Sequence, residues 1–231
     1  MKVVDRISRY LFNRLVNNYY GLNKLDKKLA SYIDFNNGFF IEAGANNGIS
    51  QSNTLYFEKY MSWRGLLIEA IPALAEQCRK NRRKCIVENC ALVSKNYPDD
   101  HIEMQYCNLM SLVKGGLGNQ ETETLHLESG KKFLRPDEEI YAVSVPTATL
   151  SSILDKHKIS KVDLLSLDVE GYEPEVLQGI DFYRHRPVFM LIEVRDRSLV
   201  ETIISPWYKP IAILSINSDY EDILYEVKGQ K

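Results

Sequence analysis

The feature that most constrains the fold of this chain is a set of acidic residues that each follow a short apolar segment. Phe39–Gly48 reads FFIEAGANNG, Gly65–Ala70 reads GLLIEA and Leu164–Gly171 reads LLSLDVEG. Short apolar runs that end in a polar or glycine-containing turn are typical of the buried strands of a parallel sheet. The sequence therefore predicts an α/β fold with a mostly parallel sheet and a binding site beyond the carboxyl ends of its strands.

The turn after the first strand indicates the kind of cofactor. A dinucleotide fingerprint needs G-x-G-x-x-G, because a pyrophosphate must lie against backbone N–H groups at a helix start. Here the turn reads GANNG over residues 44–48, and Glu42 places a carboxylate where it would repel pyrophosphate. That carboxylate suits the ammonium and sulfonium of S-adenosylmethionine. Gly44 would let the backbone approach the ligand, Gly48 would allow close helix packing, and Glu69 is placed to accept both ribose hydroxyls.

Longer stretches of the sequence resemble the FkbM family of S-adenosylmethionine-dependent methyltransferases. They include IEAGANNGISQSNTLYFEKYMSWRGLLIEAIP, LMSLVKGG and VDLLSLDVEGYEPEVLQGIDF, and the resemblance covers roughly residues 38–195. It implies a class I methyltransferase fold, which is Rossmann-like, and O-methylation of a hydroxyl of a sugar or glycan-related substrate. Glu42 stands where many relatives carry Asp, so the charge is kept and the reach of the side chain changes.

The resemblance, together with the turn chemistry, gives a set of cofactor-binding candidates around the strand ends. Asn89, Cys90 and Ala91 follow the third predicted strand and are the expected neighbours of the adenine ring. The whole set comprises Glu42, Gly44, Asn46, Gly48, Glu69, Ala70, Asn89, Cys90, Ala91 and Asp168.

Three carboxylates are the catalytic candidates. Asp168 and Glu170 lie two residues apart after the fourth strand, and Glu193 ends the fifth. A sugar hydroxyl is too weak an acid to lose its proton unaided, so methyl transfer needs a general base or a metal. In one interpretation Asp168, Glu170 and Glu193 bind Mg²⁺. In a second, Asp168 binds the methionine ammonium and Glu170 or Glu193 is the base or a substrate anchor. In a third they are structural, with Glu170 and Glu193 capping helices or pairing with Arg195 or lysines.

The sequence predicts one domain over residues 36–231 and a helical extension over residues 1–35. Leucines and tyrosines at helical spacing favour an amphipathic cap in that extension. Residues 95–148 break the alternation of helices and strands and predict an inserted flap, in which 101–107 and 139–145 alternate like strands. Residues 211–216 and 223–227 predict a terminal antiparallel hairpin, and helices are expected on both faces of the sheet.

The remaining polar residues are assigned mainly to the surface. His101, His157 and His185 are expected there, while His126 lies in a polar run of the insertion and has a minor candidacy as a base. The basic residues that follow position 78, from Arg79 to Lys84, are expected to form a solvated helix end. The four cysteines lack metal-site spacing and are expected to be free thiols.

Composition limits the classes of partner. The net charge of −2 gives no footprint for nucleic acid, so we expect a small-molecule or glycan substrate. No apolar run reaches the ~20 residues of a membrane span, and charged residues interrupt any signal-like segment; a cytoplasmic location and a homo-oligomer are the expectations. Two alternatives stay open, a non-catalytic interaction module and a nicotinamide-dependent sugar oxidoreductase.

Overall fold

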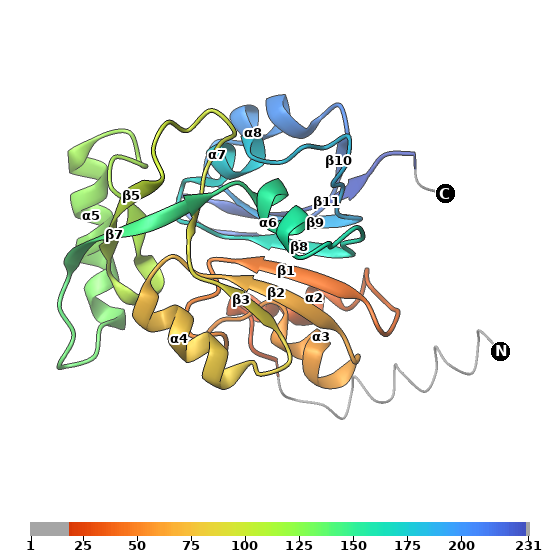
Figure 1. Cartoon of the computed structure of the whole chain (residues 1–231), viewed down its shortest axis with the longest axis horizontal. Helices are drawn as coiled ribbons and strands as arrows, with labels where there is room; N and C mark the ends of the chain where they lie inside the picture. Colours follow the sequence, from red (N-terminus) through yellow and green to blue (C-terminus); the bar gives the residue numbers. More distant parts are fainter. Residues whose placement is uncertain (1–18, 230–231) are drawn as a thin grey trace.

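The computed structural model describes residues 19–229, and Figure 1 shows a central sheet with helices on both of its faces. The sheet has seven strands in the order β10-β11-β9-β8-β1-β2-β3. The pairs β1–β2, β1–β8, β2–β3 and β8–β9 are parallel. Strand β11 runs antiparallel to both β9 and β10, so the predicted terminal hairpin and the mostly parallel sheet are confirmed.

The element bounds agree with the main sequence predictions to within a few residues. The strands of the large sheet are β1 (Phe39–Ala43), β2 (Arg64–Ile68), β3 (Ile86–Glu88), β8 (Leu164–Leu167), β9 (Phe189–Val194), β10 (Tyr208–Ile216) and β11 (Glu221–Val227). The helices are α2 (Leu25–Leu29), α3 (Leu55–Tyr60), α4 (Pro72–Asn81), α5 (Gln120–Gly130), α6 (Leu150–Lys156), α7 (Glu173–Gln178) and α8 (Arg197–Ile204), with short 3₁₀ turns η1 (Leu22–Lys24), η2 (Asn108–Met110) and η3 (Lys131–Phe133).

Two apolar layers hold the helices against the sheet. On one face, α6, α7 and α8 contribute Leu154, Leu177 and Val200 to a core with the inward side chains of β1, β8 and β9. On the other face of the sheet, Leu29 of α2 and Phe57 of α3 pack on the side chains that β1, β8 and β9 direct to that face. Because both faces are covered, the parallel strands read as continuous apolar runs, and their first polar side chains appear near the carboxyl ends.

The insertion and the short strand just before it form a second, smaller sheet in the order β4-β7-β5-β6. Its strands are β4 (Ala91–Leu92), β5 (His101–Tyr106), β6 (Leu112–Val113) and β7 (Tyr141–Ala148), and the long pair β5–β7 is antiparallel. Figure 1 shows β5, β7 and α5 lying beyond the ends of β1, β2 and β3. The insertion therefore stands at the edge where the binding site was predicted.

Three surface assignments made from the sequence were wrong. The polar run 120–130 is helix α5, capped by Asn119, and its His126 is buried because that face of the helix packs on η2. His185 is also buried, with Nδ1 3.0 Å from Ser151 Oγ. Arg82 is 1% exposed, because carboxylates from two other elements surround it.

Other expectations have simpler outcomes. His101 is exposed, and His157 is partly exposed and contacts Glu88. The four cysteines are free, three of them buried. Within residues 19–229 no helix has the length and apolar character needed to cross a bilayer. The predicted helical extension is described only from residue 19, where Leu25, Leu29 and Ile33 cap the core; its earlier residues lie outside the described part.

Candidate functional site

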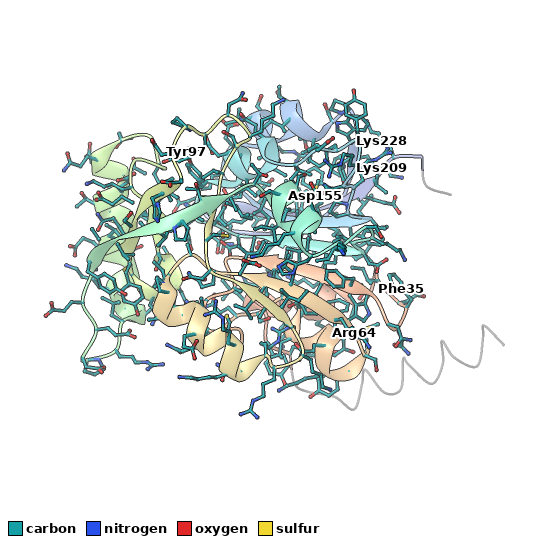
Figure 2. All side chains as sticks on the ribbon, in the orientation of Figure 1. Phe35, Arg64, Tyr97, Asp155, Lys209 and Lys228 are labelled. Carbon is teal, nitrogen blue, oxygen red and sulfur yellow. The ribbon has the colours of Figure 1, made fainter. Side chains whose placement is uncertain are left out.

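A cavity of about 520 Å³ lies at the carboxyl ends of β1, β2, β8 and β9. The turns after these strands form its floor, and residues of η2 and η3 from the insertion form the opposite wall. In Figure 2, Phe35 and Arg64 mark the amino-terminal ends of β1 and β2, and Tyr97 of the insertion lies at the other end of the molecule. A cavity of this size at a strand-end edge fits a nucleoside-bearing cofactor.

Eight of the ten predicted cofactor residues line this cavity. They are Glu42, Gly44, Asn46, Glu69, Ala70, Cys90, Ala91 and Asp168. Gly48 does not line it and packs instead on α4, where an added Cβ would lie 2.8 Å from Arg82 Cγ. Asn89 is also outside the lining, and its Nδ2 donates to the carbonyl oxygens of Glu69 and Ala70. Asn89 thus joins the ends of β2 and β3.

Gly44 is needed because two strand-end turns come very close together. Its φ is +81°, and a Cβ there would lie only 1.8 Å from the carbonyl oxygen of Asp168. From the sequence, Gly44 was predicted to let the backbone approach a ligand closely. In the structure, the group that lies closest to Gly44 is the backbone of the turn after β8. Gly44 therefore sets the spacing between the β1 and β8 turns at the cavity floor.

Glu42 is held by the turn that follows Gly44. Its carboxylate accepts hydrogen bonds from Ser52 Oγ, from the backbone N–H of Asn53 and from Thr54 Oγ1, at 2.7 to 3.0 Å. Arg82 Nη1 lies 3.6 Å from Glu42 Oε2, and Arg82 Nε donates to Glu58. The sequence placed Glu42 against the cofactor; the structure places it on the cavity wall and gives both oxygens protein donors. Glu42 therefore anchors the turn.

Glu69 joins the end of β2 to the β1 turn. Its Oε2 accepts the backbone N–H of Asn46 at 2.7 Å, and its Oε1 accepts that of Ile71 at 2.8 Å. Burial raises the pKa of Glu69 to about 7, and the backbone donors oppose this rise. A carboxylate fixed in this way on the cavity wall keeps lone pairs for further donors such as ribose hydroxyls.

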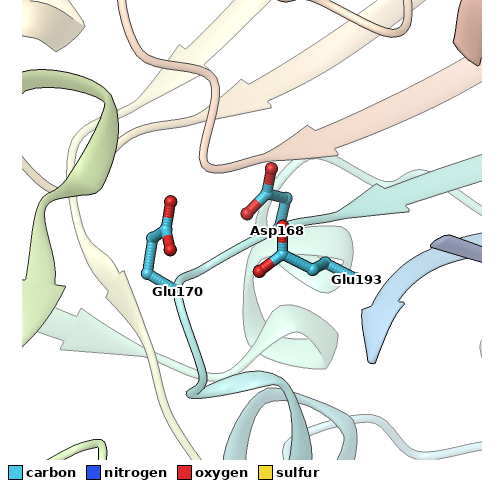
Figure 3. Close-up of side chains that lie close together, drawn as sticks. All are labelled: Asp168, Glu170 and Glu193. Carbon is cyan, nitrogen blue, oxygen red and sulfur yellow. The ribbon is translucent and has the colours of Figure 1, made fainter. Parts of the chain in front are cut away.

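Asp168, Glu170 and Glu193 come together, as the strand-end argument predicted. One carboxylate oxygen from each lies within 4.8 Å of the others. Figure 3 shows Asp168 and Glu170 on the turn after β8, with Glu193 reaching in from β9. Glu170 has a φ of +56°, and Glu173 Oε1 accepts the N–H groups of Val169 and Gly171, which holds this turn in place.

Arg195 supplies a positive charge to the three carboxylates. Its Nη2 donates to Glu170 Oε2 at 2.7 Å and to Glu193 Oε1 at 2.9 Å. Burial nevertheless raises the pKa of Asp168 to about 6. Burial and repulsion from Asp168 raise the pKa of Glu193 to about 11 and hold that of Glu170 well above its usual value. The cluster is therefore short of positive charge and suited to a cationic ligand.

His126 reaches this cluster from the insertion without lining the cavity. Its Nε2 is 3.1 Å from the carbonyl oxygen of Met110 and 3.5 Å from Glu170 Oε2, and burial lowers its pKa. The sequence gave no direct signal for this contact, because it depends on how α5 packs against the turn after β8. His126 therefore stands behind Glu170 rather than over the cavity.

Two side chains at the cavity have buried oxygens without a donor among residues 19–229. They are Asn53 Oδ1 and Asp168 Oδ1. Sequence reasoning missed Asn53, which lies in the ISQSN stretch between the Gly44 turn and helix α3, where no local pattern marked it.

Comparison with known proteins identifies one family. A sequence model described as the methyltransferase FkbM domain matches residues 42–205. The sequence search found no match among curated proteins.

Solved structures match this chain at low identity. A methyltransferase FkbM from Methylobacillus flagellatus KT is 16% identical with a TM-score of 0.50, and the match covers 82% of this chain and 43% of that one. Fibrillarin from Aeropyrum pernix, solved with natively bound S-adenosyl-L-methionine, is 11% identical with a TM-score of 0.46, covering 83% and 67%. A TehB-like S-adenosylmethionine-dependent methyltransferase from Corynebacterium glutamicum is 10% identical with a TM-score of 0.44, covering 99% and 100%. The chain spans less than half the length of the first of these proteins.

Proposed function

The chain belongs to the FkbM methyltransferase family, and from this premise we propose that it moves a methyl group from S-adenosylmethionine to a hydroxyl of a sugar or glycan-related acceptor. The observation that carries the proposal is the placement of Glu69 and Asp168 on either side of the Gly44 turn, in one cavity. Strand β1 lies between β2 and β8, so the two carboxylates flank its carboxyl end. That spacing suits the ribose and the methionine end of one cofactor.

The charge of the cavity supports a cationic cofactor. Six carboxylic residues line it, Glu42, Glu69, Asp168, Glu170, Glu193 and Asp219, while its cationic residues are Lys132 and Arg195. A pyrophosphate would be repelled here, whereas a sulfonium and an ammonium would be attracted. In this proposal Glu69 accepts hydrogen bonds from the ribose hydroxyls and Asp168 accepts them from the ammonium. Cys90 and Ala91 lie beside the adenine ring.

We assign the role of general base to Glu170. The acceptor oxygen attacks the sulfonium methyl carbon in line, the C–S bond breaks with its electron pair going to sulfur, and the hydroxyl proton passes to the carboxylate. The raised pKa of Glu170 makes it a better proton acceptor than an exposed carboxylate. Its left-handed backbone conformation is the kind of strained geometry that occurs at functional sites. The nearby sulfonium would favour the ionised form that the base needs.

The same three carboxylates also fit a second role, the binding of a divalent metal. Their oxygens converge, and Asp168 Oδ1 has no donor among residues 19–229. Asp168, Glu170 and Glu193 would hold Mg²⁺, which would acidify an acceptor hydroxyl. Arg195 competes for two of these residues, so the metal would have to displace its hydrogen bonds.

The test is transfer of labelled methyl from S-adenosylmethionine to a panel of free, nucleotide-linked and lipid-linked sugars, with Mg²⁺ or with EDTA. We expect a labelled, base-stable methyl ether on at least one acceptor. Glu170→Gln should lower kcat by a factor of 100 or more and leave S-adenosylhomocysteine affinity within about threefold. The exposed Glu121→Gln is the matched control. Transfer that survives in Glu170→Gln would remove Glu170 from the mechanism, and loss of transfer in EDTA would favour the metal.

Two alternatives predict different results. A non-catalytic interaction module would bind no S-adenosylhomocysteine and transfer no methyl group. A nicotinamide-dependent sugar oxidoreductase would bind NAD in its place. We expect the enzyme to work in the cytoplasm, where free thiols such as those of its four cysteines stay reduced.

A further inference from the structure

The charges that line the cavity are distributed unevenly between its two sides. All six carboxylic residues belong to the strand ends and to the β10–β11 hairpin. The wall that the insertion contributes has no carboxylate, and its lining residues are apolar, amide or hydroxyl residues apart from Lys132 of η3. Lys132 is exposed, so it lies where the cavity opens to solvent. The cavity therefore has an acidic floor and one cation on the opposite wall.

The charge of Lys132 is not neutralised by the protein. Arg195, the other cation of the cavity, already donates to Glu170 and Glu193. Lys132 forms no ion pair with a carboxylate anywhere in residues 19–229, and its Nζ lies 4.9 Å from the ring centroid of Phe133, which also lines the cavity. An ammonium held over an aromatic ring keeps its charge and its N–H donors. Lys132 is therefore available to an anionic ligand.

A chain of contacts connects η3 with the proposed base. His126 Nε2 lies 3.5 Å from Glu170 Oε2 and 3.1 Å from the carbonyl oxygen of Met110 in η2. The start of η3 packs on the same turn, because a Cβ at Gly130 would lie only 2.7 Å from Met110 Cβ. Lys132 follows two residues later. An acceptor whose hydroxyl lies at Glu170 would thus extend its other groups along the wall that η2 and η3 form.

The hydroxyl groups of that wall are already engaged. Ser111 Oγ donates to the carbonyl oxygen of Asn108 at 2.7 Å, and Ser129 Oγ donates to that of His126 at 2.7 Å. The ammonium of Lys132 is thus the strongest donor on this wall, and it suits a phosphate or a carboxylate group. The carboxylates of the floor would repel such a group, so it would lie on the insertion side of the cavity.

We propose that Lys132 is a specificity-determining residue that selects an acceptor sugar carrying an anionic group, a phosphate or a carboxylate. The ammonium of Lys132 binds this group against the insertion wall while the hydroxyl to be methylated lies at Glu170. This inference rests on the proposed methyl transfer to a sugar hydroxyl. It narrows the acceptors to sugar phosphates and uronic acids and disfavours neutral sugars.

The experiment compares neutral and anionic forms of the same sugars. Protein saturated with S-adenosylhomocysteine would be titrated calorimetrically with the methyl glycoside, the 1-phosphate and the uronic acid of glucose, galactose and mannose. For at least one sugar, we expect an anionic form to bind the wild type roughly tenfold more tightly than the methyl glycoside.

Variants of two adjacent lysines assign this preference to one side chain. Lys132→Met should reduce the preference to within about threefold, whereas Lys132→Arg keeps the charge and should retain most of it. Lys131→Met is the matched control, because Lys131 is also exposed but does not line the cavity, and its Nζ donates to Glu128 Oε1 at 2.5 Å. It should behave like the wild type.

The outcomes separate this inference from the proposed function. Wild-type protein that binds S-adenosylhomocysteine but binds no anionic form more tightly than its neutral form would overturn the role of Lys132 alone. A preference that survives in Lys132→Met, or that falls equally in Lys131→Met, would overturn it as well. Wild-type protein that does not bind S-adenosylhomocysteine would overturn the proposed function and this inference together. A thermal melt of each variant checks folding.

Discussion

Replacing Gly44 with alanine should separate the two turns that form the cavity floor. A Cβ at Gly44 would lie 1.8 Å from the carbonyl oxygen of Asp168, so the turns after β1 and β8 must move apart by more than an ångström. A left-handed backbone costs a residue with a Cβ about 1–2 kcal/mol. Inserting a methyl group into a packed contact typically adds about 1–3 kcal/mol. We therefore expect Gly44→Ala to lower the free energy of unfolding by about 2–5 kcal/mol.

Gly115 provides a matched control for the backbone term. Its φ is +85°, close to that of Gly44, and a Cβ there would meet nothing within 4 Å. Gly115→Ala should therefore lower the free energy of unfolding only by the cost of a left-handed backbone, about 1–2 kcal/mol. The gain from a less flexible unfolded chain is the same in both variants and cancels.

Urea denaturation and calorimetric titration with S-adenosylhomocysteine would measure both effects. Gly44→Ala should be less stable than Gly115→Ala by about 1–3 kcal/mol. It should also bind S-adenosylhomocysteine at least tenfold more weakly, because Asp168 moves with its turn, whereas Gly115→Ala should bind like the wild type. Equal stability of the two variants together with unchanged binding in Gly44→Ala would refute the claim that this close approach builds the site.

Two further predictions concern buried charge. Arg82→Met leaves the carboxylates of Glu42 and Glu58 buried without their cation, so it should cost about 3–5 kcal/mol of unfolding free energy; the exposed Arg83→Met should stay within about 0.5 kcal/mol, and similar values for both in urea denaturation would disprove the network. Burial raises the pKa of Glu173 from 4.5 to about 7 in the folded protein, so the stability that it contributes is full below pH 4.5 and is lost as the pH rises through 7. Glu173→Gln keeps an oxygen for the N–H groups of Val169 and Gly171 but cannot titrate; its unfolding free energy, measured from pH 5 to 7, should fall less steeply than that of the wild type, by up to about 1.4 kcal/mol per pH unit, and parallel curves would show that Glu173 does not take up a proton on folding.

Features that depend on local pattern could be predicted from the sequence. The strands β1, β2, β8 and β9 were found because each is a short, mostly apolar run with an acidic residue close to its carboxyl end. The start of helix α6 is also of this local kind, since Thr149 Oγ1 accepts the N–H of Ser152 as an N-cap threonine does. The convergence of Asp168, Glu170 and Glu193 followed from one rule, that adjacent parallel strands end at one edge.

Features that depend on distant contacts could not be predicted. Arg82 looks like a solvated helix end until Glu42 and Glu58, from β1 and α3, are seen to enclose it. His126 lies in a polar run with no clear apolar stripe, so only its packing on η2 reveals a buried face. Gly44 was marked as special, but the partner that requires it, Asp168, lies far along the chain. The residue type at each of these positions indicates its chemistry, but its partner is known only from the tertiary structure.

The measurement that tests the central claim most directly is a calorimetric titration of the purified protein with S-adenosylhomocysteine and, separately, with NAD. Glu69→Ala is the companion variant, because Glu69 lines the cavity at the end of β2. The account predicts micromolar binding of S-adenosylhomocysteine, a loss of at least tenfold in Glu69→Ala, and no binding of NAD. Binding of NAD without S-adenosylhomocysteine would contradict the account and favour an oxidoreductase, and binding of neither would favour a non-catalytic module.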